Sequence, residues 1–257
     1  MTPLQKTLLL LLAIGQVAAP GVLAALGLEI GSSGDPRITP AGYAFAVWGL
    51  IVSLGLGYAV QQVTAGRGRY ERLARAIAWQ LAATYVGFVV WLVAAVTGWI
   101  WATVVIFVGM FLLLRRVYDR VLAERDGLPL PYRVFLEAQV GTYLGWTTIA
   151  IFANLAAALA FSGLEESGTF GAIWQGLILV AAAANGLYGV RRTRASPTYT
   201  AAVLWAFVGV LVGLTQHDDT RALQVLTLAA IVSVVALFFH TRASGGSRVS
   251  GATEANS

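Results

Sequence analysis

Long apolar runs separated by short polar segments set the pattern of this 257-residue chain. A helix needs about 20 apolar residues to cross roughly 30 Å of hydrocarbon. Eight runs approach or exceed that length: 6–28, 43–63, 77–97, 99–118, 134–161, 170–190, 199–215 and 222–241. Because these runs are continuous rather than alternating, they favour helices over the strands of a membrane barrel. We therefore predict an all-α, polytopic helical membrane bundle with about eight transmembrane helices.

The third and fourth runs form one uncharged stretch. Residues 77–114 carry no charged side chain, and a stretch of this length is too long for a single crossing. It is interrupted by Thr97-Gly98-Trp99, where glycine lets the chain reverse its direction. We expect a tight helical hairpin at this point.

The charged residues test this count, because lysine and arginine collect in the cytoplasmic connections of membrane proteins. Every lysine and arginine except Arg37 and Arg221 lies in the N-terminal segment, beside alternate connections beginning with 67–75, or in the C-terminal tail. The remaining connections carry the acidic residues Asp35, Glu165, Glu166, Asp218 and Asp219. The pattern predicts that both termini are cytoplasmic. A helical bundle of this kind is typical of the bacterial inner (plasma) membrane.

The two ends of the chain allow further expectations. The N-terminal segment is similar to a cleavable signal peptide. It has Lys6, then a leucine run, then the small residues Val17-Ala18-Ala19. Pro20 disfavours cleavage directly after the small residues, and the run is long enough to span, so we favour a retained, kinked helix. Residues 242–257 are rich in glycine, serine and threonine, and we expect a disordered cytoplasmic tail.

Composition supports a membrane protein and excludes several kinds of site. The chain is 58% hydrophobic and 11% charged, whereas soluble domains are about 45–50% apolar and about 25% charged. Its net charge of +5 comes from arginines in short connections, so the lipid bilayer is the expected partner and nucleic acid is not. The absence of cysteine excludes disulfides, thiolate metal sites and a cysteine nucleophile.

Few groups inside the runs are suited to catalysis or ion coupling. Glu137, near the start of the fifth run, is the one ionisable side chain well inside a predicted helix, so no lysine is placed to form a Schiff base. The expected topology puts His217 and His240 at opposite membrane faces, which excludes a metal site shared by both. HExxH, GxSxG and Walker motifs are absent. We favour a protein without enzymatic activity or a metal, and a subtler enzyme stays open.

The fifth run has the most informative polar pattern. One helix face, at intervals of three and four, carries Gln139, Tyr143, Trp146, Thr147, Ala150 and Asn154. An amide such as Asn154 needs a polar partner inside a membrane. Helix–helix contact and a ligand pocket both explain this face equally well, and both can hold at once.

The second and third runs carry similar faces. Tyr43, Phe45 and Trp48 lie near the outer end of the second run. The third run offers Gln80, Thr84, Gly87 and Trp91 at helical spacing. The three faces together are suited to a flat, amphipathic ligand, because aromatic rings would stack on it and the few polar groups would orient it.

Three of these segments resemble the TspO/MBR family, the tryptophan-rich sensory proteins. The segment from Thr39 to Leu50 is similar to that family's loop and second helix, where a proline precedes an aromatic-x-Phe-x-x-x-Trp-like run. The segment from Tyr143 to Leu155 is similar to its fifth helix, with Tyr-Leu-x-Trp, then alanine, then asparagine. Trp79 to Trp91 is similar to its third helix. The chain resembles a divergent, longer member with extra C-terminal helices.

The resemblance implies a five-helix membrane unit over 1–161, an additional three-helix segment over 162–241 and the tail 242–257. It also implies a homodimer and binding of a tetrapyrrole, such as protoporphyrin or haem, or of a sterol-like molecule. No other cofactor is implied. The ligand-binding residues that it implies are Tyr43, Phe45, Trp48, Tyr143, Trp146 and Asn154.

Three interpretations follow. The first is a membrane receptor or sensor that holds a flat hydrophobic ligand between aromatic side chains. The second is a small-molecule permease or permease subunit, in which the last three helices complete a path. The third is a membrane assembly protein, in which glycines such as Gly141 and Gly145 allow close helix contact.

Overall fold

The computed structural model describes residues 1–28, 36–64 and 70–254, apart from the side chains of Asp126 and of 245–254. Asp35 and the arginines at 67 and 69 therefore lie outside the described residues. The described chain contains helices and no strand. Eight of its helices are long and apolar enough to cross a membrane, which confirms the all-α polytopic bundle and the eight spans.

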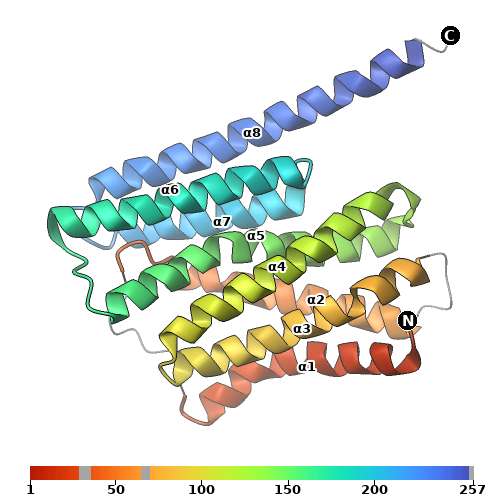
Figure 1. Ribbon diagram of the computed structural model, residues 1–257, viewed down its shortest axis with the longest axis horizontal. Coiled ribbons are helices and arrows are strands. Elements are labelled where there is room, and N and C mark those ends of the chain that lie inside the picture. Colours follow the sequence, from red (N-terminus) through yellow and green to blue (C-terminus); the bar gives the residue numbers. More distant parts are fainter. Residues whose placement is uncertain (29–35, 65–69, 255–257) are drawn as a thin grey trace.

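The helices are longer than most of the apolar runs that predict them, and Figure 1 shows how they are arranged. Their bounds are α1 Pro3–Ala25, the 3-10 helix η1 Gly42–Ala46, α2 Val47–Thr64, α3 Glu71–Val96, α4 Ile100–Glu124, η2 Arg125–Gly127, α5 Leu130–Phe161, α6 Gly168–Arg192, α7 Pro197–Leu214 and α8 Arg221–Glu254. Polar residues extend a helix past the hydrocarbon at little cost, so α3 begins at Glu71, ahead of the apolar run that starts at 77.

The predicted hairpin between the third and fourth spans is confirmed. Gly98 has φ of +79°, which favours glycine, and the chain reverses there between α3 and α4. The amide of Trp99 donates to the carbonyl of Ala94 over 2.9 Å and closes the end of α3.

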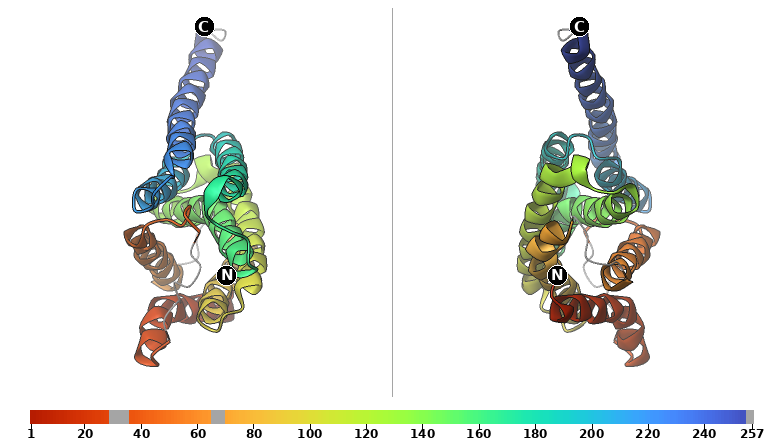
Figure 2. Two further views of the ribbon diagram at one scale, coloured as in Figure 1. Left: turned by 90° about the vertical axis from the view of Figure 1, so that its left-hand side faces the viewer. Right: turned by 90° about the vertical axis from the view of Figure 1, so that its right-hand side faces the viewer.

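The first five helices form a ring. Its order is α1, α2, α5, α4 and α3, with α3 packed back against α1. The end-on views of Figure 2 show this arrangement, with α8 on the far side from α1. Three fully buried tyrosines, Tyr58, Tyr85 and Tyr143, come from α2, α3 and α5 and fill the interior.

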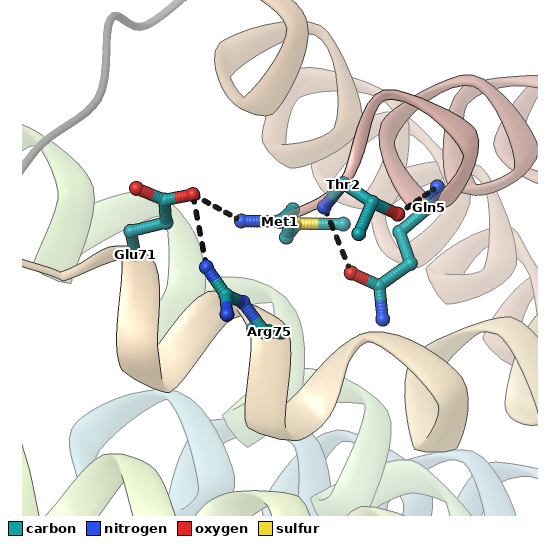
Figure 3. A network of polar contacts seen from close by, with 5 residues as sticks. All are labelled: Met1, Thr2, Gln5, Glu71 and Arg75. Carbon is teal, nitrogen blue, oxygen red and sulfur yellow. Dashed lines mark hydrogen bonds and ion pairs between the residues drawn. The ribbon is translucent and has the colours of Figure 1, made fainter.

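The start of α1 is held against the start of α3. The α-amino group of Met1 donates to Glu71 Oε1 over 3.0 Å, and Arg75 reaches the same oxygen over 3.3 Å (Figure 3). Thr2 and Gln5 form a capping box that satisfies the first amides of α1.

The last three helices pack on one side of the ring. α7 lies against α5, while α6 contacts both α5 and α8. Gly141 and Gly145 make the α5–α7 contact close: a Cβ on Gly145 would lie 2.8 Å from the Cβ of Ala202 and would meet the carbonyl oxygen of Tyr199. The small-xxx-small pair of α5 therefore binds α7 of the same chain and not a second copy.

The last helix continues beyond the rest of the bundle (Figure 1). It runs through Glu254, into the segment that the sequence predicts to be a disordered tail. Residues 242–254 contain no proline, so no residue there blocks the hydrogen bonds of a helix.

Candidate functional site

A cavity of about 160 Å³ lies at the end of the ring that carries the α3–α4 turn. The loop before η1 covers it, and α2, α3, α4, α5 and α7 contribute its walls. We call it the aromatic cavity, after its six aromatic lining residues Phe45, Trp48, Trp91, Phe107, Trp146 and Phe161. Ile100 and several alanines complete a mostly apolar lining, whose polar members are Asn154 and two threonines.

The aromatic rings are arranged with defined geometry. Trp48 stacks on Trp91, with ring centres 5.5 Å apart and planes 29° apart. Trp146 stands edge-on to Trp48 at 6.2 Å and 80°, and edge-on to Phe45 at 5.8 Å and 78°. Such pairs are favourable because the positive edge of one ring meets the negative face of the next. The rings of the wall therefore hold one another in place.

Asn154 finds its partner on α3, which lies beyond α4 in the order of the ring. Its Oδ1 accepts a 3.1 Å hydrogen bond from Trp91 Nε1, and its Nδ2 donates to the carbonyl of Ala150 over 2.8 Å. The sequence predicts that this amide needs a partner, but not which helix supplies it. Asn154 therefore positions Trp91 in the cavity wall.

Four of the six residues expected to bind a ligand line the cavity: Phe45, Trp48, Trp146 and Asn154. Tyr143 lies deeper in the ring, where its hydroxyl accepts a 3.2 Å hydrogen bond from Gln16 Nε2 and its ring meets Trp48. Tyr43 is half-exposed and stands edge-on to Trp205 of α7. Residue spacing alone does not indicate Phe107 or Ala206 as lining residues, because their helices show no polar face there.

α7 holds the loop that covers the cavity. The amide of Ala41 donates to the carbonyl of Gly209 over 2.9 Å, and Trp205 Nε1 donates to the carbonyl of Ala44 over 2.8 Å. The contact requires glycine, because a Cβ on Gly209 would lie 2.6 Å from the Cβ of Ala44. This loop and η1 together, residues 37–46, are called the roof below.

Other parts of the C-terminal segment also bind the roof. The amide of Ile38 donates to Gln175 Oε1 of α6 over 3.3 Å. Arg37 donates to the carbonyl of Asp218, between α7 and α8, over 2.9 Å. The Arg37 side chain therefore helps to hold the roof in place.

Polar side chains cross the ring on the other side of Trp48 and Trp146. Gln139 of α5 donates to the hydroxyl of Tyr85 of α3, and the hydroxyls of Tyr58 and Tyr132 lie 3.1 Å apart. These bonds join α2, α3 and α5 within an apolar core, where polar groups need partners. They support the interpretation of part of the α5 face as helix–helix contact.

Two buried donors beside the cavity have no partner. The indole N–H groups of Trp48 and Trp146 are enclosed, and neither has a hydrogen-bond acceptor among the described residues. Buried donors without acceptors are rare in proteins and call for an explanation.

A model of the family described as TSPO-like protein matches residues 7–241. The chain belongs to this family. The match includes 162–241, which the resemblance of short motifs leaves outside the five-helix pattern, so the TSPO-like match extends over all eight spans. No curated protein and no solved structure matches the chain at a significant level. The family indicates a membrane protein of the sensor or receptor kind.

Proposed function

We propose that this protein is a membrane receptor that binds a flat hydrophobic ligand, such as a tetrapyrrole or a sterol-like molecule, in the aromatic cavity. The observation that supports it is the set of three tryptophans and three phenylalanines around one apolar space. Ligand sites are commonly apolar cavities with a few placed polar groups.

The size of the cavity limits how a large ligand would bind. Its volume of about 160 Å³ is close to that of the engineered cavity of roughly 150 Å³ that takes up benzene, and below the roughly 300–1,000 Å³ of sites for larger ligands. A cavity of this volume holds one ring-sized group. The remainder of a tetrapyrrole would lie toward Phe45 and Phe161, which are 39% and 62% exposed.

The unpartnered indole N–H groups of Trp48 and Trp146 would suit a ligand that carries a hydrogen-bond acceptor. A ligand that combines a flat apolar ring with acceptor groups at its edge matches both features of the wall.

The filled interior favours a receptor over a permease. Beyond Trp48 the ring contains the fully buried side chains of Tyr143, Tyr85 and Tyr58. A translocation path through the ring would require all three to move, and their hydrogen bonds join several helices.

Protoporphyrin binding to the full chain in detergent tests the proposal. We expect saturable changes in porphyrin absorbance and quenching of tryptophan fluorescence. Trp146→Leu removes one aromatic wall and should weaken binding about tenfold, the effect of roughly 1.4 kcal/mol. Trp99→Leu is the control, because Trp99 is 71% exposed and does not line the cavity.

Equal affinity of wild type and Trp146→Leu would contradict binding in the aromatic cavity. If protoporphyrin gives no saturable signal, the same variants tested with a fluorescent sterol distinguish a different ligand from the absence of a receptor site. Failure with both ligand classes would contradict the proposal as stated.

A further inference from the structure

A second cleft lies toward the basic end of the bundle, away from the aromatic cavity. It is small, about 20 Å³, and lies between α4 and α6, both of which pack against α5. We call it the basic groove. Its rim residues are Arg115, Asp119, Tyr188 and Arg192, and its floor includes Leu144 and Thr148.

Two polar contacts bridge α4 and α6 across the basic groove. Arg115 donates to the hydroxyl of Tyr188 over 2.6 Å, and its guanidinium lies 5.0 Å from the centre of that ring. One turn further along both helices, Arg192 pairs with Asp119 over 3.0 Å. The four side chains thus form one continuous rim.

The rim carries more positive than negative charge. Asp119 is paired with Arg192, whereas Arg115 has no carboxylate within ion-pair distance among the described residues. Arg192 is 52% exposed, and each guanidinium has five N–H donors, of which the contacts above use one. The half-exposed Tyr188 accepts from Arg115, so its own O–H is still able to donate. An anion would therefore find several donors at the rim.

The deeper part of the groove is apolar. Phe111 and Leu144 line it below Arg115, and Val108 continues the same face of α4 with 39% of its surface exposed. Thr148 in the floor accepts a 3.2 Å hydrogen bond from the hydroxyl of Tyr199, so its own hydroxyl already has a partner within the protein. A water-soluble anion would gain no binding energy from this apolar wall.

We propose that the basic groove binds an anionic phospholipid from the surrounding bilayer. The phosphate lies at Arg115, Tyr188 and Arg192, and one acyl chain follows α4 past Phe111 and Val108. Arginine is suited to phosphate because its planar donors match the phosphate oxygens. Basic pockets between membrane helices are known to hold acidic headgroups, and each arginine near the surface contributes about fivefold in affinity.

The test compares phosphatidylglycerol, phosphatidylcholine and inorganic phosphate, each titrated into the full chain in detergent while thermal unfolding is followed. A ligand that binds only the folded state raises the unfolding midpoint. We expect phosphatidylglycerol alone to raise it. Arg115→Gln should require about fivefold more of this lipid for the same shift. Arg72→Gln is the control, because Arg72 is exposed near the same end but lies outside the groove.

Asp119→Asn separates lipid binding from a purely structural contact. Removing this carboxylate frees Arg192 and makes the rim more positive, so the lipid-induced shift should occur at a lower lipid concentration than in wild type. An equal shift with phosphatidylcholine, or one with inorganic phosphate alone, would overturn the proposal. So would a loss of the lipid response in Asp119→Asn, since it would make the ion pair a structural contact only.

Discussion

Trp91 of α3 donates its indole N–H to the amide oxygen of Asn154 of α5 over 3.1 Å. The two residues lie on helices that each pack directly against α4, and the bond crosses the wall of the aromatic cavity. The hydrogen bond fixes the orientation of the Trp91 ring, on which Trp48 stacks. One polar contact thus sets the position of two of the tryptophans.

We expect this bond to be measurable by a double-mutant cycle. Asn154→Leu removes the acceptor and leaves the indole N–H buried, while Trp91→Phe removes the donor. The coupling energy between the two changes should be about 0.5–1.5 kcal/mol, as for other hydrogen bonds between membrane helices. Unfolding of both single variants and the double variant in detergent gives this value. A coupling energy of zero would mean that the bond adds nothing to the folded state.

The close contact of α5 with α7 should be sensitive to one methyl group. In Gly145→Ala the new Cβ would meet the carbonyl oxygen of Tyr199, so the helices must separate. We expect a loss of about 1–3 kcal/mol in the free energy of unfolding, the range for overpacked cores. Gly109→Ala is the matched control. No heavy atom lies within 4 Å of its Cβ, and alanine is the better helix former, so its stability should not fall.

Trp205 should control the mobility of the roof. Trp205→Phe removes the N–H that donates to the carbonyl of Ala44. Hydrogen exchange in residues 36–46 should then become faster, because α7 holds this segment less firmly. In Trp79→Phe, where the side chain is 55% exposed and outside the roof, exchange of the same segment should equal that of wild type. Equal exchange in both variants would show that other contacts hold the roof.

The ion pair between Met1 and Glu71 should make a small, salt-sensitive contribution (Figure 3). Glu71→Gln removes the charge that holds the start of α1 against α3, so we expect a slightly lower unfolding midpoint than in wild type. The difference should shrink between 0.1 and 1 M salt, where the Debye length falls from about 10 to about 3 Å. Arg75→Gln leaves the Met1–Glu71 contact in place and should change the midpoint less. A difference that is independent of salt would point to a loss of packing instead.

The sequence predicts the helices better than it predicts the site. Continuous apolar runs and the interrupting Gly98 were sufficient for eight spans and their hairpin, because hydrocarbon imposes a length on each helix. Helices extend beyond the apolar runs where polar residues continue them, as at Glu71. Spacing placed Trp146 and Asn154 on one face, and both line the cavity.

Contacts between helices that are far apart in the chain could not be predicted from the sequence. Tyr43 belongs to a matching motif, yet its ring meets Trp205, because α7 occupies the space next to it. Gly145 indicated close helix contact, but its partner on α7 follows only from the order of the helices around the ring. Phe107 and Ala206 line the cavity from helices with no polar signal.

The attachment of the roof to α7 also has a consequence for biosynthesis. Trp205 and Ala44, which hold the roof and α7 together, are separated by 161 positions in the chain. A ribosome releases the N-terminal helices first, at about 5–20 residues per second. The ring helices therefore enter the bilayer seconds before α7 exists, and the aromatic cavity stays uncovered during that interval. The aromatic cavity is among the last parts of the protein to be completed.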